Sequence, residues 1–114
     1  MKKYYIVLAL LMLGIFISNC NPSKKAAATE NLSFSADLSS VITTHCSPCH
    51  IPDKGGNKLA LDNYANVKTH IDDIIHRIEL DPGVRGFMPF KKKERLSDET
   101  INLFKKWRDG GMAE

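Results

Sequence analysis

Apolar residues recur at the three- and four-residue spacing of α-helices in three segments of the chain. The first segment runs into Cys46, the second extends from Tyr64 to about Leu80, and the third begins after Leu96. Their apolar positions are Phe34, Leu38, Val41 and Ile42, then Tyr64, Val67, Ile71, Ile74, Ile75 and Ile78, then Ile101, Phe104 and Trp107. No segment of useful length alternates in the manner of a strand, so the pattern predicts an all-α fold of about three helices.

Residues that favour helix ends stand at the borders of these segments. The predicted N-caps are Ser33 or Ser35, Asp62 or Asn63, and Ser97. Gly110-Gly111 is expected to end the third helix. Residues 51–60 and 81–93 contain the glycines and prolines between the helices, and we expect them to be loops.

The first 19 residues are typical of an export signal. Lys2 and Lys3 precede an apolar run at residues 4–17, which is shorter than the roughly 20 residues of a membrane-spanning helix. Residues 17–20, Ile-Ser-Asn-Cys, resemble a lipobox, the motif at which bacterial lipoproteins are cleaved and acylated, although Ile17 and Asn19 depart from its usual residues. The resemblance implies that Cys20 is the first mature residue and carries a lipid anchor. The alternative is a soluble periplasmic protein that is cut nearby.

The charge and composition of the remaining chain narrow its expected partners. Residues 20–31 are small, polar or charged, which predicts a lipid-anchored flexible linker before a folded domain at 32–114. Loss of the two signal lysines lowers the formal charge from +3 to about +1. A nucleic-acid partner is not expected, because it would require a strongly basic domain. A domain this small commonly needs a stabilising metal, disulfide or cofactor.

Residues 46–50, Cys-Ser-Pro-Cys-His, form the C-x-x-C-H signature of covalent c-type haem attachment. Two thiols at this spacing can form thioethers with the two vinyl groups of the porphyrin. His50 is then placed as an axial ligand of the iron. Two thioethers at Cys46 and Cys49, together with a lipid on Cys20, account for all three cysteines of the chain.

Three other interpretations of this motif remain open. A thioredoxin-like redox pair would normally lie between a strand and a helix, whereas a helical pattern precedes this one. A disulfide between Cys46 and Cys49 would close a very small loop. A zinc site could use both cysteines and His50, but no second ligand pair follows at a recognisable spacing.

Met88 is the residue we expect to fill the sixth position of a haem iron, unless it is ordinary core filler. Pro89 favours an extended conformation at Met88, on a loop that could cross the opposite face of a flat ring. The weaker candidates are Met112 near a chain end expected to fray, His70 at the margin of a helix stripe, His76 expected to face water, and His45 beside Cys46.

From Phe34 onward, about 80 residues, the chain resembles a small mono-haem cytochrome c domain of class I. The features that match are the helix entering C-x-x-C-H, Met88-Pro89, the final helix at 96–107 with its aromatic residues, and the segment 59–67. The resemblance implies that the first and last helices cross, with Trp107 or Phe104 packing near Val41 or Ile42. It also implies that His and Met ligate the iron and that the haem edge transfers electrons.

Several expectations follow for the site. Its apolar walls are expected from Phe87, Phe90, Leu59, Leu61, Tyr64 and Ile71. Arg85, and second Arg77, are the expected partners of the haem propionates. Lys91-Lys92-Lys93 is either a docking patch for acidic redox proteins or a solvated loop end.

With both axial positions filled, no site remains for a small-molecule substrate. We therefore expect an electron carrier between redox protein partners and not an enzyme. It would be anchored to a membrane on the periplasmic side or at the outer surface. The alternatives are a haem-based ligand sensor, a peroxidase-like enzyme, or the electron-entry subunit of a larger oxidoreductase complex.

Overall fold

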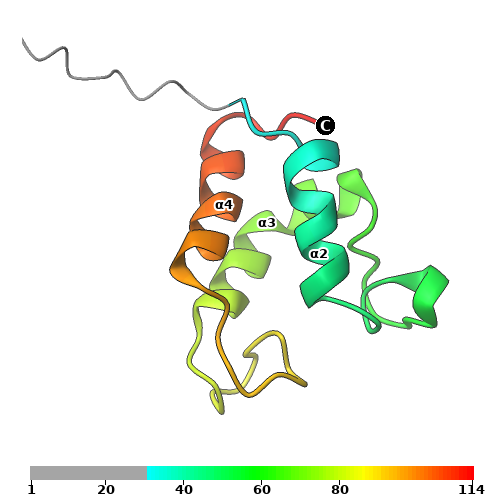
Figure 1. The fold of residues 1–114 in the computed structure, drawn as a ribbon, viewed down its shortest axis with the longest axis vertical. Coiled ribbons are helices and arrows are strands. Elements are labelled where there is room, and N and C mark those ends of the chain that lie inside the picture. Colours follow the sequence, from blue (N-terminus) through cyan, green and yellow to red (C-terminus); the bar gives the residue numbers. More distant parts are fainter. Residues whose placement is uncertain (1–30) are drawn as a thin grey trace, which may run out of the picture.

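The computed structural model describes residues 31–114, and within this range the chain forms three α-helices and no strand (Figure 1). The predicted all-α class is therefore confirmed for this part of the chain. The elements are η1 (Phe34–Leu38, a π-helical turn), α2 (Ser39–His45), η2 (Pro52–Lys54, a 3₁₀ turn), α3 (Tyr64–Glu79) and α4 (Asp98–Asp109). The predicted signal at 1–19, most of the linker at 20–31 and Cys20 lie outside the described residues.

The first predicted helix is present, but it begins as a π-helical turn that the apolar spacing did not show. Ser33 caps it: its Oγ accepts from the Ala36 amide at 3.1 Å, while its own amide donates to Asp37 Oδ2 at 2.7 Å. This reciprocal pair satisfies two of the amides that a helix start leaves without partners. The helix then continues as α2 directly into Cys46, whose amide donates to the Ile42 carbonyl at 2.8 Å.

Helix α3 begins and ends close to the predicted borders. The Asn63 side chain caps it by accepting from the Asn66 amide at 3.1 Å, and the helix ends at Glu79. Its predicted stripe faces the core, since the residues at successive turns are buried, namely Val67, Ile71, Ile75 and Ile78.

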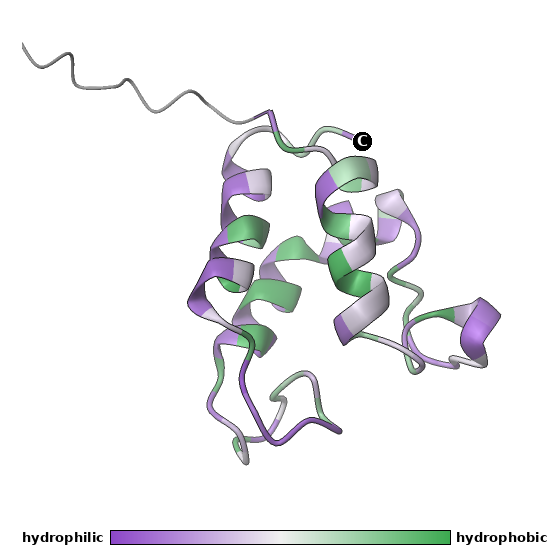
Figure 2. Cartoon of the chain, in the orientation of Figure 1, coloured by the Kyte–Doolittle hydropathy of each residue, from purple (hydrophilic) through white to green (hydrophobic). Residues whose placement is uncertain are grey.

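Helix α4 packs across α3. Ser97 caps it as predicted, and the apolar face is buried with Ile101, Phe104 and Trp107. Figure 2 shows hydrophilic residues along the outer side of this helix. Two ion pairs join the helices, Lys105–Glu79 at 2.5 Å and Arg108–Asp72 at 3.1 Å. Because these pairs are partly exposed, they contribute little to the stability of the fold. Their main effect is to align the two helices.

An aromatic cluster joins the two ends of the folded domain. The Phe34 ring lies 5.9 Å from Tyr64 and 6.4 Å from Trp107, and the Tyr64 and Trp107 rings are 6.3 Å apart, centroid to centroid. Trp107 is completely buried, and its indole N–H donates to the Ala113 carbonyl at 2.7 Å. The same carbonyl accepts from the Phe34 amide at 2.9 Å, so the C-terminus lies beside the start of η1 (Figure 1).

This arrangement corrects one expectation. The chain end does not fray at Met112: its amide donates to the Trp107 carbonyl at 3.0 Å, and its carbonyl accepts from the Tyr64 hydroxyl at 2.9 Å. Tyr64 therefore belongs to the end of the domain where the chain closes. The helical segment at residues 34–45, roughly 17 Å long, lies between the closed end with Tyr64 and Cys46. Tyr64 was expected to line the haem pocket; its hydroxyl is held at the closed end by the Met112 carbonyl, and its place in a pocket wall stays a prediction.

The crossing of the first and last segments is made mainly through the π-helical turn. Phe104, Trp107 and Ile42 share one buried core, and Val41 packs against its edge. The ring contacts of Trp107, however, are with Tyr64 and with Phe34, which lies about two helical turns before Val41.

The Tyr64→Phe substitution tests the closure of the chain end. Removal of the hydroxyl leaves the Met112 carbonyl without this donor, so we expect the free energy of unfolding to fall by about 0.5–1.5 kcal/mol. Urea unfolding followed by circular dichroism measures the change. Thr69→Ala, at an exposed position on the same helix, is the control and should shift the stability by less than about 0.5 kcal/mol. Equal stabilities of wild type and Tyr64→Phe would contradict this account.

Candidate functional site

The C-x-x-C-H motif forms a tight turn at the end of α2. Cys46 is the C-cap of the helix, and the His50 amide donates back to the Cys46 carbonyl at 3.1 Å. Ser47 adds a side-chain bond to the Thr43 carbonyl at 2.5 Å. Cys46 and Cys49 are both half-buried free thiols with no disulfide between them. The helix thus presents the two sulfurs and the histidine within one compact turn.

His50 is oriented by the backbone of the following loop. Its Nδ1 lies 2.7 Å from the Leu59 carbonyl oxygen. A carbonyl only accepts, so Nδ1 carries the proton, and in the neutral imidazole the lone pair is on Nε2. A histidine that donates one ring N–H to a backbone carbonyl is typical of a metal ligand, because the bond fixes both the tautomer and the ring plane.

The loop that supplies this carbonyl is folded tightly onto the motif. The Lys58 amide donates to the Cys49 carbonyl at 3.0 Å, and the Leu61 amide donates to the His50 carbonyl at 2.9 Å. Gly56 makes the close approach possible, because a Cβ there would lie 2.3 Å from the Pro48 carbonyl oxygen. The sequence alone marks this glycine only as part of a loop. A side chain at residue 56 would collide with the turn of the C-x-x-C-H motif. This contact between two segments is not visible in the sequence.

Met88 lies outside any helix, as Pro89 predicted, on the loop between α3 and α4. Its amide donates to the Arg77 carbonyl at 3.1 Å, and its half-buried side chain packs against the core. A turn follows at once, closed by the Lys92 amide and the Pro89 carbonyl at 2.9 Å. The Lys92 ammonium then reaches the ring of His45 on α2, with Nζ 3.2 Å from Nδ1. This contact brings the Met88 loop to the C-x-x-C-H end of α2.

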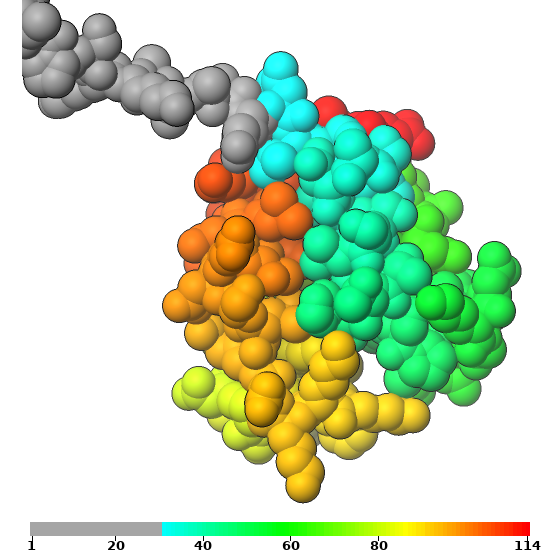
Figure 3. Space-filling model, in the orientation of Figure 1, coloured from blue at the N-terminus to red at the C-terminus, as the bar shows by residue number. Residues whose placement is uncertain are grey.

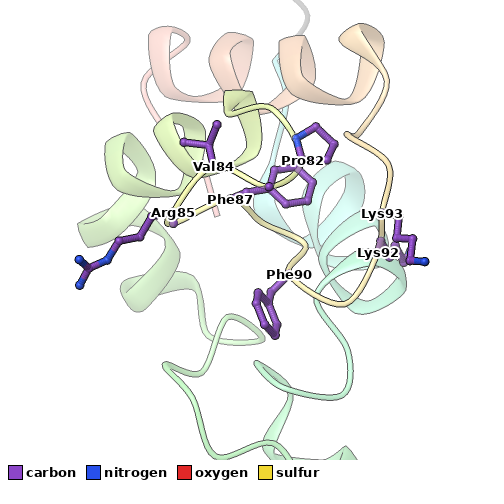
Figure 4. Close-up of a pocket in the computed structure, with 9 residues that line it drawn as sticks. Pro82, Val84, Arg85, Phe87, Phe90, Lys92 and Lys93 are labelled. Carbon is purple, nitrogen blue, oxygen red and sulfur yellow. The ribbon is translucent and has the colours of Figure 1, made fainter.

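A hollow of about 530 Å³ opens on this loop, which projects from the end of the domain opposite the C-terminus (Figure 3). Its lining, drawn in Figure 4, includes Phe87, which is buried, and Phe90, whose side chain projects clear of the loop and is 79% exposed. The other large exposed apolar residues of the described chain are Val84 on the same loop and Leu59 beside His50, at 48% and 42%. Of the other expected wall residues, Leu61 and Ile71 are buried in the core.

The other candidates for an axial ligand fall away from this region or face solvent. Met112 lies at the closed end of the domain, where it packs beside the aromatic cluster. His70 and His76 are exposed on α3, which confirms the prediction that His76 faces water. The structure therefore brings His50, Cys46 and the Met88 loop to one end of the domain and leaves these other residues elsewhere.

The surroundings of the C-x-x-C-H motif favour the neutral form of the Cys46 thiol. Burial raises the pKa of the Cys46 thiol to about 11, and the nearby Lys92 ammonium opposes the shift only in part. A reactive redox cysteine has a lowered pKa, so the raised pKa of Cys46 argues against a thioredoxin-like nucleophile. The absence of any strand among residues 31–114 argues in the same direction.

The arginines expected to face the propionates lie on the outer side of α3 and the Met88 loop. Arg77 Nε is 2.7 Å from Asp73 Oδ2, so this guanidinium already has a carboxylate partner. Arg85 is exposed and points away from the two lysines of the hollow in Figure 4. Both arginines line a second, polar hollow together with Asp73 and His76.

Comparison with known proteins gave no match: no protein-family model, no curated protein and no solved structure is similar to this chain. In residues 31–114, no three histidine, cysteine or acidic side chains gather as a metal-binding group, which gives no support to the zinc interpretation. The same residues contain no helix with the length and hydrophobicity needed to cross a membrane.

The Gly56→Ala substitution tests whether the loop must approach the motif so closely. The new methyl group would meet backbone atoms that cannot move independently, so we expect the free energy of unfolding to fall by about 1–3 kcal/mol or more. Gly55→Asn is the matched control. Gly55 has a positive φ of 81° but nothing within 4 Å of a Cβ, and asparagine tolerates this conformation. Urea unfolding should therefore give a much lower free energy of unfolding for Gly56→Ala than for Gly55→Asn. The reverse order would refute the packing argument.

Proposed function

We propose that this chain is an exported, lipid-anchored c-type cytochrome that carries single electrons between redox proteins. In this proposal the three helices form a cytochrome c-like fold around one covalent haem. The observation that carries the proposal is the orientation of His50. In the motif that signals haem attachment, the histidine donates from Nδ1 to the Leu59 carbonyl and keeps Nε2 available for a metal.

The residues present fit a haem in both chemistry and placement. Cys46 and Cys49 are half-buried and not joined by a disulfide, on the same turn as His50, which leaves both sulfurs available for thioether formation. Met88 would be the second axial ligand, on a loop held to the end of the same helix through Lys92. Phe90 and Leu59 are exposed apolar side chains on the two loops at this end, which a flat apolar ring would cover.

When bound, the haem supplies an iron that alternates between the ferric and ferrous states. The chain's own residues set which state is favoured. A thioether ligand from Met88 and an apolar surround from Phe87 and Phe90 favour the ferrous form, because they stabilise the added positive charge of ferric iron poorly. With His50 and Met88 both engaged, no position is left for a substrate, and the protein is an electron carrier and not an enzyme.

The surface of the Met88 loop favours an acidic partner. Lys91, Lys92 and Lys93 are all exposed immediately after the ligand loop. Cations grouped beside the redox centre would accelerate association with a negatively charged protein at low ionic strength. Attachment to a membrane through lipid on Cys20 would confine this encounter to the periplasmic side or the outer surface.

The experiment that tests the proposal is expression of the full chain with a haem-attachment system. We expect the protein to show a c-type absorption spectrum and to keep its haem after denaturation. The double variant Cys46→Ala, Cys49→Ala should lose covalent haem completely. Cys20→Ser should retain haem and lose membrane association. A wild-type protein without covalent haem would refute the proposal.

The Met88→Leu variant tests the sixth ligand and separates a carrier from a sensor. Wild-type ferric protein should show the weak far-red band of methionine sulfur bound to iron, and its ferrous form should not bind carbon monoxide. Met88→Leu should lose the band and bind carbon monoxide, because leucine has no donor atom. Met112→Leu is the matched control at the closed end and should behave as wild type. Carbon monoxide binding by the wild-type protein would favour the ligand-sensor alternative.

A further inference from the structure

A side-chain hydrogen bond joins α2 to the loop that carries Met88. Lys92 Nζ lies 3.2 Å from His45 Nδ1, across 47 residues of sequence. We propose that His45 and Lys92 form a clip that positions the Met88 loop, and that protonation of His45 opens this clip. Both are positioning residues, since they act through the loop. The inference rests on the proposed function only in naming iron as the partner of Met88.

The chemistry of the two groups determines the direction of the hydrogen bond. A lysine ammonium has three donors and no acceptor, so His45 Nδ1 must be the acceptor. The bond therefore exists only while Nδ1 carries no proton. Protonation of His45 removes the acceptor and leaves two positive charges about 3 Å apart, which repel each other.

The position of Lys92 couples the clip to Met88. The Lys92 amide is bonded to the Pro89 carbonyl at 2.9 Å, so one tight turn connects the clip with the residue after Met88. On the other side, the Met88 amide is bonded to the Arg77 carbonyl of α3 at 3.1 Å. Met88 thus lies between two attachments, one to α3 and one to α2. Most of the loop around it is exposed and adds little packing.

The groups that face His45 favour its neutral form. Burial first, and then the Lys92 ammonium, hold the pKa of His45 below its usual value. The other titratable neighbour is the Cys46 thiol, which is uncharged at neutral pH because burial raises its pKa to about 11. The contribution of the clip is therefore complete above about pH 6.5, the pKa of a detached histidine. It is lost as the pH falls below that value toward the lowered pKa of the clipped state.

For a protein exposed to the pH of its surroundings, the clip would link Met88 ligation to acidity. Release of the clip would leave Met88 held by its hydrogen bond to α3 and its packing against the core. The carrier would then bind its sixth ligand less firmly in mildly acidic conditions than at neutral pH.

The test is a pH titration of the full-length protein and of three variants of this region. The far-red methionine band is followed in the ferric protein, and amide hydrogen exchange of residues 90–93 is measured in parallel. We expect the wild-type band to weaken in a one-proton step below about pH 6.5. His45→Gln should keep the band throughout this range, because the glutamine carbonyl can accept from Lys92 and does not titrate.

The lysine variants supply the controls. Lys92→Gln removes the ammonium and should remove the pH step and increase amide exchange at neutral pH, whereas Lys93→Gln should match wild type. A pH step of equal size and midpoint in wild type and His45→Gln would overturn the proposal, as would identical behaviour of Lys92→Gln and Lys93→Gln.

Failure of the proposed function would give a different result. If no covalent haem forms, no methionine band appears in any variant, but amide exchange still reports on the clip. Amide exchange of residues 90–93 should then rise in acid in the wild type and not in His45→Gln. That result would support the clip even if the protein binds no haem. The same pH dependence in both proteins would overturn the clip as well.

Discussion

The burial of Trp107 is the constraint on which the rest of the domain depends. Its ring lies against Phe34 at the start of the folded chain and Tyr64 at the start of α3, and its indole N–H holds the backbone at Ala113. A side chain of this size contributes several kcal/mol when it is fully buried. Because three distant segments meet on it, the same ring fixes the crossing of α4 with η1 and α3.

The domain is closed by packing around Trp107 at one end, and loops form the opposite end. The segments 51–61 and 81–95 contribute only three buried residues to the described domain, namely Ile51, Leu61 and Phe87. Backbone hydrogen bonds and a few side-chain contacts therefore determine their shapes. A small domain with one well-packed end and one end made of loops gains most from a large apolar group bound at the looser end. The C-x-x-C-H turn is placed where such a group would be attached.

The sequence predicted the parts of the fold that depend on local periodicity and capping. Ser97 and the buried face of α4 are examples, because the cap and the apolar stripe lie within one helix. The features it did not predict depend on contacts between distant residues. Tyr64 has the spacing of a core residue in α3, and only the return of the chain to Met112 shows that it belongs to the closed end. Gly56 needs to be glycine because of the Pro48 carbonyl, which no pattern in its own loop displays.

In the candidate site, too, some features follow from local sequence patterns and others depend on contacts between distant residues. The roles of Cys46, Cys49 and His50 were predicted from their spacing, but the state of the histidines depends on their partners. His50 donates from Nδ1 to a carbonyl, whereas His45, five residues earlier, accepts at Nδ1 from an ammonium. The first partner fixes the proton of a neutral ring on Nδ1, which leaves the lone pair on Nε2. The second favours a neutral ring whose contact is lost on protonation. The two histidines, five residues apart, therefore differ in the role of Nδ1, and the loops that fold against the motif make this difference.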